Sequence, residues 1–223
     1  MLRSGAALLF DIDGTLADTD AHHLAAFNQV FAPKGHTFDH LRFTRELQGF
    51  AMRDIEERFL GDEPQARRSE IMAEKEAVFR ALARAHIRPM NGLMTLLDRL
   101  QELGVPIAAV TNAPRANAEM VLSGLGITGR FQALIIADEL AHGKPHPLPY
   151  LEGLRALGAD PAHSLAFEDS RSGIKSATAA GIATIGLATS LTEVELVAAG
   201  AVAAVSDFGD PQIAEWMRKR IGI

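Results

Sequence analysis

The chain has 223 residues, of which 48% are hydrophobic and 22% charged, the composition of an ordinary globular protein with a large core. Its net charge of −6 argues against nucleic acid or an anionic membrane as the main partner, because basic surfaces bind both. The absence of cysteine excludes disulfides, thiol catalysis and thiolate metal sites. The apolar run before Asp11 is too short for a signal sequence or membrane span, so we expect a cytoplasmic protein. We expect it to be either a monomer or a small homo-oligomer.

Short, continuous apolar runs recur along the chain, as is typical of strands buried on both faces of a parallel sheet. Helical patterns lie between them: leucines from Leu93 to Leu103 follow a helical spacing that ends at Gly104, and Pro114 suits the start of the next helix. Strand and helix alternate, which predicts an α/β fold with right-handed crossovers. The predicted strands are residues 6–10, 107–110, 134–136, 165–167, 183–187 and 201–205.

One segment, residues 17–86, interrupts this alternation. It contains no clear strand, only helical periodicity such as that of Met72, Glu76 and Phe79. Seven of the eleven phenylalanines fall in it, which predicts a core of its own. We interpret it as a helical cap inserted after the first strand of a Rossmann-like parallel sheet. The sheet and its helices would then comprise residues 1–16 and 87–223.

Two carboxylates, Asp11 and Asp13, directly follow the first predicted strand. Open α/β sheets bind their ligands at this end of the strands. The two carboxylates repel each other unless a cation or a shared proton compensates, and hard oxygen ligands favour Mg²⁺. Gly14 permits the sharp turn that lets both side chains face one pocket. Taken alone, the pair is explained equally well without a metal site, as one aspartate at the end of a strand and another in the turn that follows.

Three further segments end other predicted strands. Thr111 and Asn112 precede a helix N-terminus, where a phosphate can bind, although Asn112 could instead cap the helix. Lys144, held between glycine and proline, can act as a fixed charge on phosphate or be a solvated loop lysine. Glu168 and Asp169 form a second acidic pair, which alone could simply complement a helix dipole. Because all four segments occur in order at the ends of different strands, we interpret them as one site.

These segments resemble motifs one to four of the haloacid dehalogenase superfamily, and the helical insert resembles its phosphoglycolate phosphatase and β-phosphoglucomutase-like branch. The resemblance implies that Asp11 attacks phosphorus and forms an aspartyl-phosphate, while Asp13 serves as the acid and base. Members that cleave carbon–halogen bonds or phosphonates lack a carboxylate at the position of Asp13, so we expect neither activity. The implied phosphoryl-binding residues are Thr111, Asn112 and Lys144, and the implied Mg²⁺ ligands are Asp11, the backbone carbonyl of Asp13, Asp169, and Glu168 directly or through water.

Two cap residues bear on the choice between phosphatase and mutase. His23 matches a histidine of β-phosphoglucomutase-like proteins, although its neighbour His22 could face the site instead. Where the mutases carry a phosphate-binding arginine, this chain has Met52, with Arg53 one position further. Arg53 could therefore point away or bind a smaller acidic substrate. We expect a phosphatase of a small phosphorylated metabolite, of the phosphoglycolate or sugar phosphate class. A β-phosphoglucomutase-like mutase is the alternative, and a non-catalytic phosphate-ester binding protein is less favoured.

Overall fold

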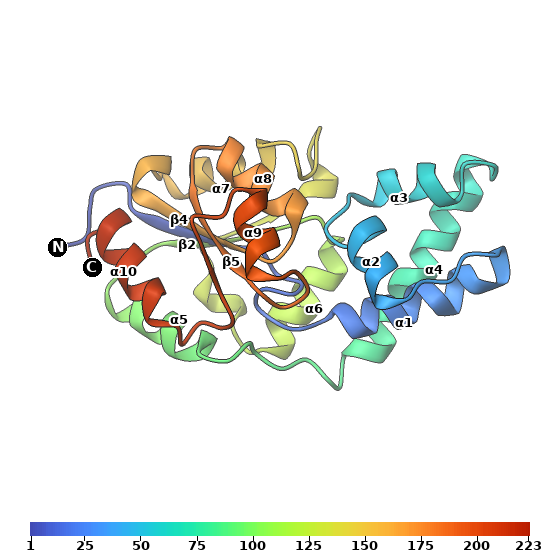
Figure 1. Ribbon diagram of the computed structural model, residues 1–223, viewed down its shortest axis with the longest axis horizontal. Coiled ribbons are helices and arrows are strands. Elements are labelled where there is room, and N and C mark those ends of the chain that lie inside the picture. The colour runs from blue at the N-terminus through green and yellow to red at the C-terminus, as the bar shows by residue number, and fades with distance from the viewer.

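The computed structural model describes residues 1–223 as a parallel six-stranded sheet covered by helices, with four further helices beyond one edge of the sheet (Figure 1). The strand order is β3-β2-β1-β4-β5-β6, so β1 lies between β2 and β4 in the middle of the sheet. The predicted α/β class with a Rossmann-like parallel sheet is therefore confirmed. The strands are β1 (Ala7–Phe10), β2 (Ile107–Thr111), β3 (Ala133–Ile136), β4 (Ser164–Glu168), β5 (Ala183–Leu187) and β6 (Ala203–Val205).

The burial of the strands explains why their sequences are continuously apolar. Every residue of β1, β2, β4 and β5 is buried, whereas the edge strands β3 and β6 are partly exposed. Successive side chains of a strand point to opposite faces, so Leu8 and Phe10 join one core and Ala7 and Leu9 the other. Each predicted strand lies within two residues of an observed one.

Helices cover both faces of the sheet. The core that contains Phe10 includes residues of α5 (Leu93–Glu102), α6 (Arg115–Gly124) and α10 (Pro211–Arg220). The opposite core includes residues of α7 (Leu148–Leu157) and α8 (Arg171–Ala179), and α9 (Glu193–Ala199) packs on β5 and β6. Short 3-10 turns complete the chain: Ala32–Lys34, Thr128–Arg130, Ala137–Glu139 and Pro161–His163. None of the helices is long and apolar enough to cross a membrane.

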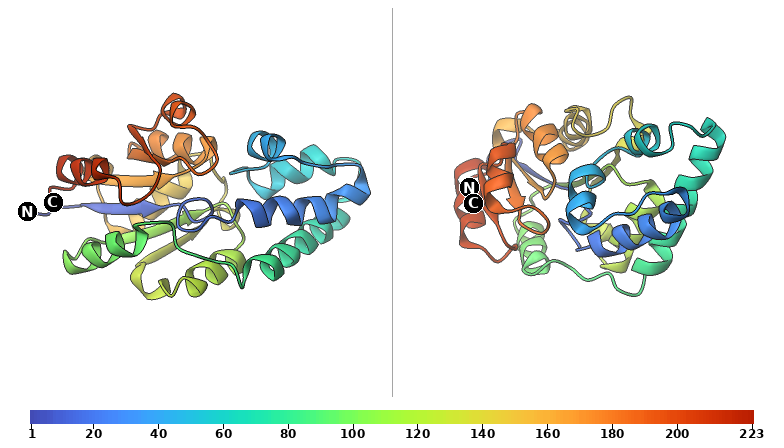
Figure 2. Two further views of the ribbon diagram at one scale, coloured as in Figure 1. Left: turned by 60° about the horizontal axis from the view of Figure 1, so that its bottom comes forward. Right: turned by 45° about the vertical axis from the view of Figure 1, so that its right-hand side comes forward.

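Four helices form the segment predicted to be a cap: α1 (Asp20–Phe31), α2 (His40–Glu46), α3 (Met52–Phe59) and α4 (Gln65–Ala83). Five phenylalanines belong to a cluster of 11 buried residues that comes only from these helices and their connections. Figures 1 and 2 show these helices at one end of the molecule and both chain termini at the other. The four helices all lie within residues 17–86; the division of the chain into two domains at these positions stays a prediction.

Candidate active site

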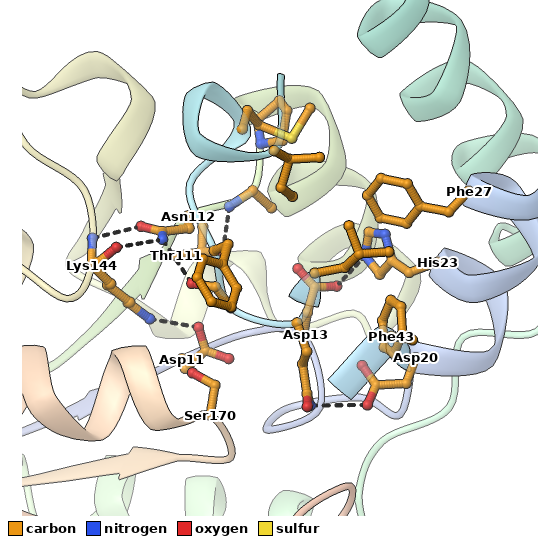
Figure 3. Close-up of a pocket in the computed structure, with 18 of the residues that line it drawn as sticks. Asp11, Asp13, Asp20, His23, Phe27, Phe43, Thr111, Asn112, Lys144 and Ser170 are labelled. Atoms are coloured by element: carbon orange, nitrogen blue, oxygen red, sulfur yellow. Dashed lines mark hydrogen bonds and ion pairs between the residues drawn. The ribbon is translucent and has the colours of Figure 1, made fainter. Parts of the chain in front are cut away.

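A cavity of about 90 Å³ lies where the carboxyl ends of the strands meet the four-helix segment (Figure 3). The chain reaches it from the loop after each central strand, because parallel strands all end at the same edge of the sheet. Most of the residues predicted from the four sequence motifs line this cavity: Asp11, Asp13, Thr111, Asn112, Lys144 and Asp169. The remaining motif residue, Glu168, lies directly behind it and is fully buried.

Lys144 is a buried cation at the floor of this cavity. Its Nζ lies 2.7 Å from Oδ1 of Asp11 and 2.5 Å from Oε1 of Glu168, and it also donates to the carbonyl of Val110 at 2.8 Å. Burial opposes its charge, but the two carboxylates outweigh burial and raise the pKa of Lys144. Only 2% of the residue is exposed, so the interpretation of Lys144 as a solvated loop lysine is wrong.

Three carboxylates, Asp11, Glu168 and Asp169, place oxygen atoms within 4.8 Å of one another and could hold a metal ion. Burial is the main cause that raises the pKa of Asp11 to about 8, with Lys144 opposing it and Glu168 adding to it. Burial, followed by the charge of Asp11, also raises the pKa of Asp169 well above its usual range. Such a cluster favours a bound cation, because each carboxylate disfavours the ionised form of the others.

The two carboxylate oxygens of Glu168 differ in their partners. Oε1 accepts from Lys144 and from the hydroxyl of Tyr150 at 2.9 Å, and Oε2 accepts from the hydroxyl of Ser170 at 3.1 Å and the N–H of Asp169 at 3.2 Å. These contacts hold Glu168 in one orientation, and through it they hold the ammonium group of Lys144.

Thr111 and Asn112 organise the loop after β2 rather than the helix that follows. Asn112 Oδ1 accepts from the backbone N–H of Lys144 at 2.9 Å, and its Nδ2 donates to the carbonyls of Lys144 at 3.2 Å and Gly49 at 3.1 Å. Thr111 Oγ1 accepts from the N–H of Ala113 at 2.9 Å. The N-cap position of α6 is Pro114, so the interpretation of Asn112 as a helix cap is wrong.

Asp13 points away from the three clustered carboxylates, toward the start of α1. Its Oδ1 accepts from the hydroxyl of Thr19 at 2.7 Å and lies 3.4 Å from Nε2 of His23. The Nζ of Lys75 lies 2.9 Å from Nδ1 of the same imidazole, which therefore offers Nε2–H to Asp13. Burial acts to raise the pKa of Asp13, but the contacts with His23, Thr19 and Lys75 outweigh it and lower the pKa.

The structure distinguishes the two adjacent histidines of α1. His23 lines the cavity and stacks on Phe79 with ring centroids 3.7 Å apart. His22 instead stacks on His86, with centroids 5.6 Å apart, and does not line the cavity.

Arg53, predicted as a substrate contact, does not line the cavity. Its side chain is 85% exposed, and its Nε pairs with Oε1 of Glu57 at 3.0 Å, one helical turn further along α3. Met52 and Ile55 line the cavity from the same helix, which turns Arg53 to the outer face. The prediction that Arg53 takes part in the site is not supported.

Several residues that line the cavity were not predicted from the sequence. Gln48 donates from Nε2 to Oδ2 of Asp169 at 2.7 Å and to Oδ2 of Asp20 at 3.0 Å, and nothing in the local sequence indicates this. Lys75 and Glu76 form a buried ion pair with 2.9 Å between Nζ and Oε1. A signal for Glu76 did exist, because a charged residue occupies an apolar stripe of the predicted helix.

Comparison with known proteins places the chain among phosphatases. The sequence pattern of the family described as "Haloacid dehalogenase-like hydrolase" matches residues 8–187. Validoxylamine A 7'-phosphate phosphatase of Streptomyces hygroscopicus subsp. limoneus is 35% identical over 81% of this chain and 84% of its own length. Phosphoglycolate phosphatase of Xylella fastidiosa is 33% identical over 78% of this chain and 76% of its own length. A crystal structure of a CbbY variant from Rhodobacter sphaeroides with xylulose-(1,5)bisphosphate superposes with a TM-score of 0.82 at 28% identity, over 94% of this chain and 96% of that one.

Proposed function

Because the chain belongs to the haloacid dehalogenase-like hydrolase family, we propose that it is a Mg²⁺-dependent phosphatase that forms an aspartyl-phosphate on Asp11. Its substrate would be a small phosphorylated metabolite of the phosphoglycolate or sugar phosphate class, in keeping with the two phosphatases to which it is similar. The small cavity between sheet and cap suits a compact substrate.

One observation supports this proposal above the others: two aspartates two residues apart have opposite electrostatic environments. The pKa of Asp11 is raised, chiefly by burial, whereas contacts with His23, Thr19 and Lys75 overcome burial and lower the pKa of Asp13. Carboxylates whose pKa values are pushed apart are suited to different roles in one reaction. A bound cation would favour the ionised form of Asp11, in which it can attack as the nucleophile. The lowered pKa of Asp13 favours its ionised form, which is suited to the role of base, so Asp13 must take up a proton when the phosphate ester binds before it can act as the acid.

The donor set fits Mg²⁺. Asp11, Glu168 and Asp169 supply hard oxygen ligands, and the only buried cation beside them is Lys144. The side chain of Asp13 is held by Thr19 and His23, so its backbone carbonyl is the group that it could offer. When bound, Mg²⁺ supplies positive charge that favours ionised Asp11 and polarises the phosphoryl group.

The side chains of this site would each have a separate role in the reaction. Asp11 attacks phosphorus and the bond to the leaving oxygen breaks, while Asp13 gives that oxygen a proton. Lys144, whose position is held by Glu168, neutralises charge that develops on the phosphoryl oxygens, and Thr111 lines the same side. Water then attacks the phosphorus of the aspartyl-phosphate, the bond between Asp11 and phosphorus breaks, and Asp13 takes one proton from that water. Phosphate leaves, and both aspartates return to their initial states.

A phosphomutase is a weaker proposal for this chain. A mutase must hold a bisphosphate at both ends, and no arginine lines the cavity. The arginine of the loop that could serve, Arg53, is paired with Glu57 on the outer surface. The absence of any substitution among the four motifs likewise disfavours a non-catalytic binding protein.

The test is phosphate release from a panel of phosphoglycolate, hexose phosphates, polyol phosphates and nucleoside monophosphates, with Mg²⁺ and with excess EDTA. We expect release that needs Mg²⁺ and that Asp11→Asn abolishes, while Asp62→Asn in an exposed cap turn leaves it unchanged. Absence of release from every ester would refute the phosphatase proposal. Conversion of β-glucose 1-phosphate to glucose 6-phosphate faster than hydrolysis would establish the mutase instead.

A further inference from the structure

We propose that the cap selects phosphate monoesters whose leaving group carries no second negative charge, and that Glu76 sets this selectivity by neutralising Lys75. The inference rests on the proposed phosphatase function and narrows its substrate class to phosphates of neutral, hydroxyl-bearing metabolites. It starts from the cations that the cavity offers to a substrate.

Only two lysines and no arginine line the cavity. Lys144 lies at the sheet, paired with Asp11 and Glu168, where it would meet the transferred phosphoryl group. Lys75, on α4, is therefore the one permanently charged cation on the cap side, where the leaving group must lie. A carboxylate or second phosphate on the leaving group would depend on Lys75 for its neutralisation.

The charge of Lys75 is already compensated. Its Nζ lies 2.9 Å from Oε1 of Glu76 and 2.9 Å from Nδ1 of His23, and it sits 4.1 Å from the ring centre of Phe27. Only 2% of Lys75 is exposed. A buried ion pair of this kind resists separation, because removing either partner leaves the other charge unpaired in a low dielectric.

Glu76 cannot easily turn away to release Lys75. Its second oxygen, Oε2, accepts from Nδ2 of Asn117, and Oδ1 of Asn117 accepts in turn from Arg80 at 2.8 Å. Asn117 is fully buried on α6, which packs on the sheet, so this bond ties the carboxylate of the cap to the core. Burial acts to raise the pKa of Glu76, but Lys75 and its other neighbours lower it, which keeps the group ionised.

The rest of the cap side of the cavity provides no alternative cation. Its remaining side chains are apolar except for the amide of Gln48 and the carboxylate of Asp20, and Arg53 is turned outward to Glu57. An anionic leaving group would therefore meet apolar side chains and the charge of Glu76, whereas a hydroxyl group could bond to Lys75 or Glu76 without breaking their pairing. The apolar wall consists of Phe27, Phe43, Leu47, Phe50, Met52 and Ile55.

The test uses pairs of esters in which the leaving group carries either a neutral hydroxymethyl group or a carboxylate at the same position: sn-glycerol 3-phosphate against 3-phosphoglycerate, and 2-hydroxyethyl phosphate against phosphoglycolate. We expect the wild-type protein to have a higher kcat/KM for the neutral ester of each pair, by about tenfold, which corresponds to about 1.4 kcal/mol. A higher or equal value for the anionic esters would overturn the inference. Absence of turnover of all four esters and of the wider panel would instead refute the phosphatase function itself.

Glu76→Gln keeps the shape of the side chain and removes its charge. We expect the ratio of anionic to neutral kcat/KM to rise about tenfold, because Lys75 is then free to pair with the substrate. A general catalytic defect lowers both values and cancels in the ratio. Glu74→Gln removes the same charge from the exposed side of α4 and should leave the ratio unchanged. An unchanged ratio in a folded Glu76→Gln protein would overturn the role of Glu76, and the wild-type comparison remains decisive if that variant does not fold.

Discussion

Nε2 of Gln48, in the loop between α2 and α3, donates to Oδ2 of Asp169 at the end of β4 over 2.7 Å. The same amide nitrogen lies 3.0 Å from Oδ2 of Asp20 at the start of α1. The adjacent Gly49 carbonyl accepts from Asn112 and from Ser172, so this cap loop is fastened to the ends of two central strands. The cap therefore contacts the proposed metal site directly.

Gln48→Ala should weaken Mg²⁺ binding, because the amide orients the carboxylate of Asp169 through one of its oxygens. Loss of such a supporting hydrogen bond typically lowers metal affinity about 10–100-fold. The measurement is phosphatase activity as a function of Mg²⁺ concentration. Gln65→Ala on the exposed start of α4 is the control, and equal Mg²⁺ dependence in both variants would contradict the assignment.

Gly14→Ala should abolish activity and destabilise the fold. Gly14 has φ +78°, and a Cβ atom there would collide with the carboxylate of Asp169. Gly104→Ala is a matched control, because Gly104 has φ +65° but nothing within 4 Å of its Cβ position. Backbone strain should lower the free energy of unfolding of both variants by about 1 kcal/mol, as measured by urea unfolding. Only Gly14→Ala should lose more than this and lose turnover; equal effects would argue against the close contact with Asp169.

Lys144→Met should reduce both turnover and stability. Asp11 and Glu168 would lose the cation between them, and breaking a buried pair in this way costs about 3–5 kcal/mol. Loss of the charge opposite the phosphoryl group should also lower kcat by about 10²-fold or more. Thermal unfolding should show a lower Tm that Mg²⁺ partly restores, because the ion supplies positive charge to the same carboxylates. Lys175→Met on the exposed face of α8 should change neither quantity, and an unchanged Tm in Lys144→Met would count against the buried pair.

His23→Phe should shift the pH dependence of catalysis. Phenylalanine can still stack on Phe79, but the hydrogen bond to Asp13 is lost. Because this contact lowers the pKa of Asp13, its removal should raise that pKa, and the limb of the kcat/KM profile that reports Asp13 should move to higher pH. His40→Phe, at an exposed position of α2, should leave the profile in place. A His23→Phe profile that coincides with the wild type would exclude His23 as a partner of Asp13.

The sequence alone determined the class of fold and the position of the motifs, because both depend on local signals. The apolar runs mark strands buried on two faces, and parallel strands bring the residues that follow them to one edge of the sheet. Asp11, Thr111, Lys144 and Asp169 can be grouped on this basis from the sequence alone, and all four line the cavity.

Only the tertiary structure decided what each cap residue contacts. His23 faces the cavity and Arg53 faces solvent because the packing of α1 and α3 sets the direction of each side chain, and helical periodicity alone does not. The contact between Gln48 and Asp169 joins residues 121 positions apart, and the bond between Glu76 and Asn117 joins cap to core. Such contacts depend on how two packed units meet, which the pattern of either segment does not specify.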